Sequence, residues 1–363
     1  MKKNRLVKLI AVASSLIVAM TGVYFAATSQ KSSDKPETLF RKVLTDHGFV
    51  YGINYFTMGF GYRQYTGKTD VSFDEKAVSD GLYNIKQIGL DAVQIWLFNR
   101  TEGLIYDESG DIIGVQEEFL QNVRKTCEIA KELDVYLAFT VQPHFDYTLE
   151  SGLYGGSKEI YDKYTRFITD PSVRKNYIEK AVKPTLEVLA DYPEILFGIT
   201  AYCEPEGDIY GTPNGYKPWG TSIEVMTDFI AAITEASREV LPDVPVSVAS
   251  GWDYGDSIQY FNRLNLDYIG MDIYDDNGDV QNLQNMALTS PAVLTEFGPS
   301  EKAGSTNSYF HITNYQTFIS NAKLGGYVGA FYWCYSGKGT MQSLLGSSKL
   351  TDNSPSISRS VCR

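Results

Sequence analysis

The segment ILFGITAYCEPEG, residues 195–207, places a nearly continuous apolar run directly before a polar turn. Strands that are buried on both faces of a parallel sheet show such unbroken runs. Seven further runs of this kind recur along the chain, and helical patterns separate most of them. They are FVYGINYF (49–56), DAVQIWLF (91–98), DVYLAFTV (134–141), VPVSVAS (244–250), LDYIGMDIY (266–274), PAVLTEF (291–297) and YVGAFYW (327–333). Eight strands alternating with helices predict a single (β/α)8 barrel domain. The alternative is an open doubly wound sheet, but no GxGxxG motif follows an early strand.

Three segments between these runs have the apolar spacing of amphipathic helices. They are residues 117–133, 172–191 and 221–241. We expect Thr221 to cap the start of the third helix. The longest insertion, residues 142–171, joins the third and fourth predicted strands.

Composition narrows the classes of partner. The chain has 363 residues, with 32 Lys plus Arg against 44 Asp plus Glu, and its net charge is −12. This balance argues against nucleic acid, because phosphate binding needs clustered cations. The cysteines match no disulfide framework and no zinc pattern, so we expect mostly buried free thiols and no metal or cofactor. They are Cys127, Cys203, Cys334 and Cys362.

The ends of the chain differ from the predicted barrel. Basic residues precede the uncharged run over 9–27, so residues 1–28 are expected to form an export signal or an N-terminal membrane anchor. We expect residues 29–46 to be a polar spacer, residues 47–345 to form the barrel, and residues 346–363 to be a loose Ser-rich tail. The expected protein is an exported monomer, extracellular or at the cell surface, with possible membrane attachment through 9–27.

Two glutamates lie where a barrel enzyme keeps its chemistry, at the C-terminal ends of strands. Glu204 follows the fourth predicted strand, and Glu296 ends the seventh. Paired carboxyl groups, one protonated and one ionised, are what the hydrolysis of a glycosidic bond needs. Glu206 competes with Glu204 for this role, but Pro205 ends the strand directly behind Glu204, which favours Glu204.

Residues 48–340 resemble the retaining glycoside hydrolases of the (β/α)8 clan, most of all family 5, which includes cellulases and β-mannanases. The most specific segment is FITDPSVRKNYIEKAVKPTLEVLADYPEILFGITAYCEPEG. The resemblance implies that Glu204, in the position of the Asn-Glu-Pro motif, is the acid/base. It also implies that Glu296, in TEFG, is the nucleophile, and that Trp333 is a sugar platform.

Three positions depart from the family pattern. Cys203 stands where the family has Asn, and Gln94 stands where it has Arg. Asp272 begins Asp-Ile-Tyr, where the family has His-x-Tyr. Gln94 cannot supply a charge that keeps a carboxylate ionised, and Cys203 is a weak donor. Tyr274 is kept, and we expect its hydroxyl to hold Glu296 in line.

Aromatic residues complete the expected substrate site. Trp96, Trp219, Trp252 and Trp333 all fall on the catalytic face of the predicted barrel, where flat rings stack on sugars. His144 follows the third strand and is expected to line the cleft. These residues join Tyr274, Gln94, Cys203 and Asp272 as candidate substrate-binding residues.

The resemblance implies a retaining, endo-acting glycoside hydrolase that cleaves an extracellular β-linked polysaccharide of the β-mannan or β-glucan type by double displacement. A catalytically weak or inactive carbohydrate-binding barrel is an alternative, motivated by residues 94, 203 and 272. A transglycosylase that remodels a surface polysaccharide is another, because it would use the same residues.

Overall fold

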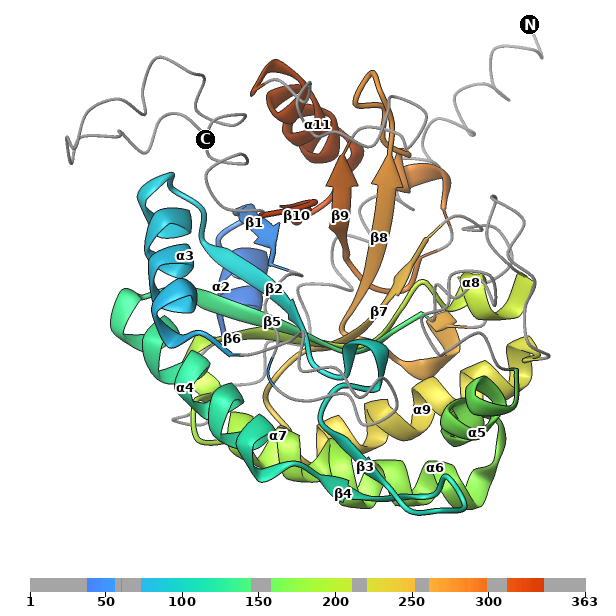
Figure 1. The fold of residues 1–363 in the computed structure, drawn as a ribbon. Helices are drawn as coiled ribbons and strands as arrows, with labels where there is room; N and C mark the ends of the chain where they lie inside the picture. Colours follow the sequence, from blue (N-terminus) through green and yellow to red (C-terminus); the bar gives the residue numbers. More distant parts are fainter. Residues whose placement is uncertain are drawn as a thin grey trace, which may run out of the picture. The chain divides into compact units, whose positions relative to one another are not determined.

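The computed structural model describes residues 38–55, 60, 73–144, 158–210, 221–251, 261–286, 288–298 and 312–335. Within them, eight parallel strands close into a barrel (Figure 1). The strands are β1 Val50–Asn54, β2 Ala92–Trp96, β5 Tyr136–Pro143, β6 Leu196–Cys203, β7 Val246–Ser250, β8 Tyr268–Tyr274, β9 Ala292–Gly298 and β10 Gly329–Tyr332. Each overlaps one of the eight predicted runs, and β10 pairs with β1 to close the barrel. The predicted (β/α)8 fold is therefore confirmed.

Helices run along the outside of the barrel (Figure 1). They are α3 Glu75–Gln87, α4 Glu117–Leu133, α5 Lys158–Thr169, α6 Pro171–Tyr177, α7 Lys183–Leu189, α8 Pro205–Tyr210, α9 Ile223–Val240 and α11 Ile312–Gly325. Single 3₁₀ turns are η1 Asn99–Thr101, η4 Pro193–Ile195, η5 Asn262–Leu264 and η6 Leu283–Asn285. Helix α4 shows why these segments are helical, because Phe119, Val123, Cys127 and Ala130 are buried at spacings of three and four residues.

The predicted helix over 172–191 is one helical stretch with an internal irregularity. A π-helical segment, η3 Ile178–Val182, joins α6 to α7. Pro184 has no N–H for an i to i−4 bond, and such a gap favours a local π bulge. The stretch begins at Asp170, whose Oδ1 accepts hydrogen bonds from the backbone N–H groups of Ser172 and Val173.

The capping residue of α9 differs from the expectation. The Oγ of Ser222, not of Thr221, accepts a hydrogen bond of 3.3 Å from the backbone N–H of Val225. Ser222 has extended backbone angles, as a capping residue requires. The prediction for Thr221 is wrong because Ser and Thr adjoin here and either could cap by sequence alone.

A hairpin after β2 and a helix before β1 were not expected from the sequence. After β2 the chain forms a hairpin of β3 Leu104–Tyr106 and β4 Ile112–Val115. Helix α2 Leu39–Thr45 lies within the segment expected to be a polar spacer, and its Phe40 and Val43 are buried. The expectation of a spacer over 29–46 is therefore wrong for residues 39–45.

Phe40 closes one end of the barrel. Its ring centroid lies 5.6 Å from that of Phe197 and 4.9 Å from that of Tyr268, each at the start of its strand. It belongs to an apolar cluster with Val50, Ala92 and other residues near strand starts. The N-terminal end of the barrel is thus filled with apolar side chains, which leaves the C-terminal end for chemistry.

Within the described part of the chain, no helix is long and apolar enough to cross a membrane. The run over 9–27 and the tail over 346–363 lie outside the described residues, and so does Cys362. Cys127 and Cys203 are buried free thiols, as expected, and Cys334 is also buried.

Candidate active site

Polar side chains gather at the C-terminal ends of β1, β2, β6, β8 and β9. The strand register brings them together in pairs. Asn54 of β1 is the partner of Gln94 of β2, and Asp272 of β8 is the partner of Glu296 of β9. Partners on neighbouring parallel strands point to the same side of the sheet. Asn54, Gln94, Asp272 and Glu296 are all buried.

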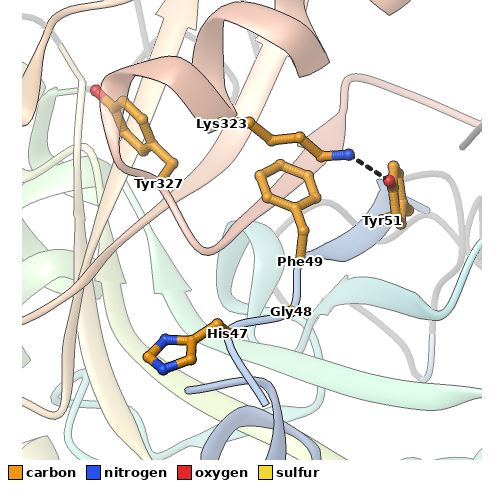
Figure 2. A pocket seen from close by; sticks show the side chains of 6 residues that line it. All are labelled: His47, Gly48, Phe49, Tyr51, Lys323 and Tyr327. Atoms are coloured by element: carbon orange, nitrogen blue, oxygen red, sulfur yellow. Dashed lines mark hydrogen bonds between the residues drawn. The ribbon is translucent and has the colours of Figure 1, made fainter. Parts of the chain in front are cut away.

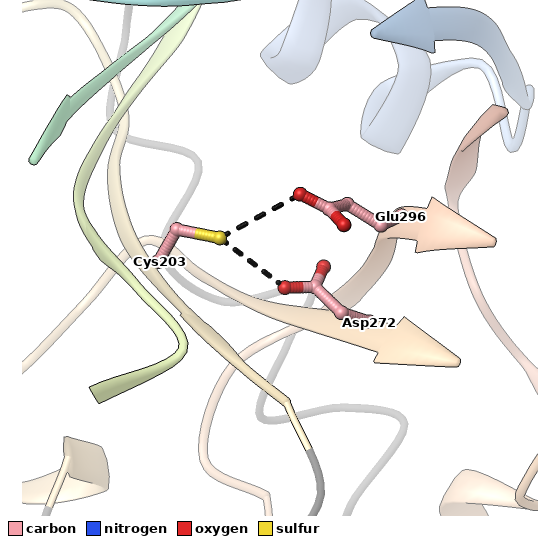
Figure 3. A group of neighbouring side chains, drawn as sticks. All are labelled: Cys203, Asp272 and Glu296. Atoms are coloured by element: carbon pink, nitrogen blue, oxygen red, sulfur yellow. Dashed lines mark hydrogen bonds between the residues drawn. The ribbon is translucent and has the colours of Figure 1, made fainter. Parts of the chain in front are cut away.

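Glu296 is held through both carboxyl oxygens. The hydroxyl of Tyr274 donates a hydrogen bond of 2.5 Å to Oε2, as the sequence predicted for this tyrosine. The thiol of Cys203 lies 3.7 Å from Oε1 (Figure 3). The Glu296 side chain is therefore fixed by one strong and one weak donor.

Asp272 shares the Cys203 thiol with Glu296. Its Oδ2 lies 3.4 Å from Sγ of Cys203, and its Oδ1 accepts a hydrogen bond of 2.6 Å from the hydroxyl of Thr295. Figure 3 shows the thiol between the two carboxyl groups. A thiol has one proton, so it donates to one of these two acceptors at a time.

The electrostatics of this cluster favour protonated acids. Burial raises the pKa of Glu296 well above its ordinary value, and the negative charges of Asp272 and Glu204 raise it further. Burial and the charge of Glu204 raise the pKa of Asp272 in the same direction. The pKa of the Cys203 thiol is also raised, first by burial and then by the neighbouring carboxylates. Cys203 is therefore a neutral thiol, as expected of a small buried residue at a strand end.

Glu204 follows β6 directly, and its backbone has a left-handed φ of 54°. Its N–H donates a hydrogen bond of 2.9 Å to the carbonyl of Ala249. Its Oε2 lies 3.0 Å from Nδ1 of His144, and its side chain is 14 % exposed. His144 thus reaches the candidate acid/base from the end of β5, in keeping with its expected place in the cleft.

Glu206, the competitor of Glu204, has a different environment. It is fully buried in α8. It accepts hydrogen bonds from the hydroxyl of Ser250 and from the N–H of Gly251, the latter at 3.1 Å. These bonds tie the start of α8 to the end of β7. The contacts of Glu206 therefore fit a structural role better than a catalytic one.

Gln94 bonds to a residue that the sequence analysis did not single out. Its amide donates a hydrogen bond of 2.8 Å to Oδ1 of Asn54. The amide of Asn54 in turn donates one of 2.9 Å to the carbonyl of Thr295, next to Glu296. Gln94 thus acts on the backbone of β9 through Asn54.

Two of the four tryptophans form a pair. Trp96 ends β2, Trp333 follows β10, and their ring centroids lie 5.2 Å apart with an interplanar angle of 36°. The peptide bond between Trp333 and Cys334 is cis. Trp219 and Trp252 lie outside the described residues, so their expected place on the catalytic face stays a prediction.

Asn54, Thr295 and Cys334 were not singled out from the sequence as parts of the site. Asn54 is a polar residue at the end of an apolar run. Its place at a strand end, the signal that identified the two glutamates, could therefore have identified it too. Cys334 is buried, and its pKa is raised to about 12 by burial and then by the charge of Glu296. No sequence signal links Cys334 to Glu296, because their closeness depends on how β10 ends.

Cys203, Asp272 and Glu296 offer sulfur and oxygen atoms within 4.8 Å of one another. A metal ion would need the thiolate form of Cys203. The raised pKa of that thiol disfavours the thiolate, and the thiol proton is shared between the two carboxyl groups. We therefore interpret the three side chains as a hydrogen-bonded cluster.

A pocket of about 560 Å³ lies elsewhere, near the start of β1 and the end of α11. Figure 2 shows Lys323 beside the rings of Phe49 and Tyr51. Its Nζ donates a hydrogen bond of 2.6 Å to the Tyr51 hydroxyl and lies 5.1 Å from the Phe49 ring centroid. No predicted site residue lines this pocket, and it is on the side of the barrel away from the two glutamates.

Neither a family model nor a curated protein sequence matches the chain. Solved structures do match. A β-mannanase from the blue mussel Mytilus edulis has a TM-score of 0.61 and 18 % identity, over 82 % of this chain and 90 % of that one.

An endo-1,4-β-mannanase from Eisenia fetida gives a TM-score of 0.60 at 19 % identity, over 80 % of this chain and 86 % of that one. A GH5_18 protein from Streptomyces cattleya, in complex with GlcNAc, gives a TM-score of 0.59 at 16 % identity, over 79 % of this chain and 70 % of that one. The chain has the fold of these proteins. At these identities the likeness shows the (β/α)8 barrel, which agrees with the resemblance to family 5 drawn from the motifs.

Proposed function

We propose that the chain is a retaining glycoside hydrolase with Glu296 as nucleophile and Glu204 as acid/base. The observation that carries this proposal is the pair of glutamates at the C-terminal ends of β6 and β9, close enough for the charge of Glu204 to raise the pKa of Glu296. A retaining mechanism uses two carboxyl groups roughly 5 Å apart. The shared fold of the β-mannanases agrees with this assignment.

In the first step, an oxygen of ionised Glu296 attacks the anomeric carbon and the glycosidic C–O bond breaks. Glu204 gives its proton to the leaving oxygen. In the second step, Glu204 takes a proton from water, the water oxygen bonds to the anomeric carbon, and the ester bond to Glu296 breaks. In each step, the bonds formed and broken and the proton transferred involve only the two carboxyl groups, the sugar and water.

The surroundings of each glutamate suit its role. The hydroxyl of Tyr274 fixes one oxygen of Glu296, so the carboxylate is oriented before the sugar arrives. Glu204 is partly exposed and lies 3.0 Å from His144. His144 is thus placed to orient the acid/base.

The proposed substrate is a β-linked polysaccharide of the β-mannan or β-glucan type, cut internally. The paired rings of Trp96 and Trp333 support stacking on sugar faces. We include export of the protein in the proposal, because such a polysaccharide is found outside the cell. Attachment through residues 9–27 and a monomeric state are also part of it.

A non-catalytic carbohydrate-binding barrel is the second candidate. Among the described residues, no Lys, Arg or His side chain lies within ion-pair distance of Glu296. A nucleophile must be ionised, and a cation would favour that form. A transglycosylase would use the same residues and is recognised by its products.

The test is the activity of the full chain on soluble β-mannan and β-glucan. We expect reducing ends from at least one, and a loss of about three orders of magnitude in kcat for Glu296→Gln. For Glu204→Gln we expect a loss of about a hundredfold to ten-thousandfold. The matched control is Glu187→Gln, an exposed position on α7, which should leave kcat unchanged.

Nuclear magnetic resonance of the first-formed product reports its anomeric configuration. A β product supports retention, and an α product would rule out the covalent mechanism while leaving a hydrolase. Binding of a glycan without cleavage, equal in all four proteins, would favour the non-catalytic barrel. Products longer than the donor would indicate transglycosylation.

A further inference from the structure

The surroundings of Glu296 are unusual for a carboxylate that must ionise. Among the described residues, five titratable groups approach Glu296 from the elements packed around it, and none of these five is a cation. They are Asp272 and Tyr274 of β8, Cys203 and Glu204 at the end of β6, and Cys334 after β10. His144, after β5, contacts Glu204. From β1, the neutral amide of Asn54 bonds to the carbonyl of Thr295, next to Glu296, and from β2 the amide of Gln94 bonds to Asn54.

Asp272 is the acid most firmly tied to Glu296. The two residues are Cα partners on β8 and β9. One carboxyl oxygen of each residue and Sγ of Cys203 lie within 4.8 Å of one another. Asp272 is 1 % exposed and Glu296 is 4 % exposed. Water therefore screens little of the repulsion between them.

Asp272 is the member of the pair that ionises first. An aspartic acid is intrinsically the stronger acid, by roughly 0.4 pH units. The hydroxyl of Thr295 donates a hydrogen bond to Asp272, and the hydroxyl of Tyr274 donates one to Glu296. The shared thiol of Cys203 is closer to Asp272, at 3.4 Å against 3.7 Å. The first negative charge is therefore stabilised on Asp272.

We propose that Asp272 is a positioning residue whose negative charge keeps the proton on Glu296, so that Asp272 sets the lowest pH at which Glu296 acts as a nucleophile. The proposal rests on the role proposed above for Glu296. It gives a function to the aspartate that stands where the resembling enzymes have His. Burial and the charge of Asp272 raise the pKa of Glu296, which agrees with this direction.

The kinetic test compares the full chain with Asp272→Asn on the β-glycan that the wild type cuts. Removing the charge lowers the pKa of Glu296, so the acid limb of kcat/KM moves to lower pH, by one pH unit or more. A purely structural role of Asp272 would lower kcat/KM without moving that limb. The control is Asp279→Asn, which removes the same charge from an exposed residue after β8 and should leave the limb in place.

An acid limb that stays in place in folded Asp272→Asn overturns the proposal. If that variant does not fold, Thr295→Val replaces it. This change removes the hydroxyl donor of Asp272, so Asp272 ionises at higher pH and Glu296 loses its proton earlier. The acid limb then moves in the same direction, and a limb that stays in place again contradicts the proposal.

A second test needs no substrate. Between the unfolded and folded pKa values of a raised acid, the folded protein binds more protons, so stability falls as the pH rises. The Tm of Asp272→Asn minus that of the wild type should therefore increase from pH 5 to pH 8. In a Glu296→Gln background this increase should be smaller, because the partner acid is gone. A difference that does not vary with pH overturns the proposal.

The two tests separate failure of the proposal from failure of the proposed function. If the Tm difference increases with pH but no glycan is cleaved, the hydrolase assignment is wrong and the coupling between Asp272 and Glu296 stands. If a glycan is cleaved but neither the Tm difference nor the acid limb of kcat/KM changes as expected, the hydrolase assignment stands and the proposed role of Asp272 is wrong.

Discussion

Glu204 adopts a backbone conformation that few residues other than glycine adopt. Its φ of 54° is in the left-handed region, which costs an L-residue about 1–2 kcal/mol. The conformation turns the chain from β6 into α8 and directs the Glu204 side chain toward His144. Gly251, at the end of β7, makes room for it, since a Cβ there would lie 2.9 Å from both Cγ and Oε1 of Glu204.

Gly251→Ala should therefore displace the acid/base without unfolding the barrel. The added methyl group pushes the Glu204 carboxyl group out of place, and a shift of about 1 Å can cost about a hundredfold in rate. We expect kcat on the cleaved β-glycan to fall by about tenfold to a hundredfold, with KM and the far-ultraviolet circular dichroism spectrum little changed. A raised KM with an unchanged kcat would contradict this placement of Glu204.

At the scale of the element, the capping of α9 shows what a local contact adds to stability. The hydroxyl of Ser222 accepts a hydrogen bond from the N–H of Val225, while the buried hydroxyl of the adjacent Thr221 has no hydrogen-bond partner in the described part of the chain. An unpartnered buried hydroxyl is unfavourable. The two neighbouring hydroxyl groups therefore have opposite effects on the same helix.

Ser222→Ala should lower the free energy of unfolding by about 1 kcal/mol, the usual value of a lost cap. Thr221→Val keeps the shape and removes the unpartnered hydroxyl, so it should leave that free energy unchanged or raise it slightly. Urea unfolding followed by tryptophan fluorescence measures both. A loss in Thr221→Val as large as that in Ser222→Ala would mean that Thr221 is the cap after all.

The same scale shows which elements the sequence could predict. The eight strands were predictable because each is an apolar run buried on both faces. Helix α2 was not, because its seven residues are too few to show a helical repeat of apolar side chains. The two glutamates, Tyr274 and His144 were predictable from their places at strand ends. Asn54 could have been found in the same way. The contacts of Cys334 and Gly251 with the site could not, because they depend on register and on close approach between strands.

At the scale of the whole molecule, the two ends of the barrel differ: one is packed with apolar side chains and the other contains the candidate active site. The N-terminal end holds the apolar cluster around Phe40. The C-terminal end holds buried acids whose pKa values are raised by their burial and by one another. Buried acids of this kind weaken the fold at neutral pH. The tightly packed apolar end offsets that cost.

Phe40→Ala should accordingly destabilise the barrel without changing its chemistry. Phe40 is 2 % exposed, and removing such a ring from a core costs about 3–5 kcal/mol. We expect urea unfolding to show a loss of this size, while kcat of the folded fraction stays within about twofold of the wild type because the site is at the opposite end. Lys42→Ala, an exposed change on the same helix, is the matched control and should cost little. An equal loss in both variants would mean that α2 contributes through its helical conformation, and a negligible loss in Phe40→Ala would mean that α2 does not close the barrel.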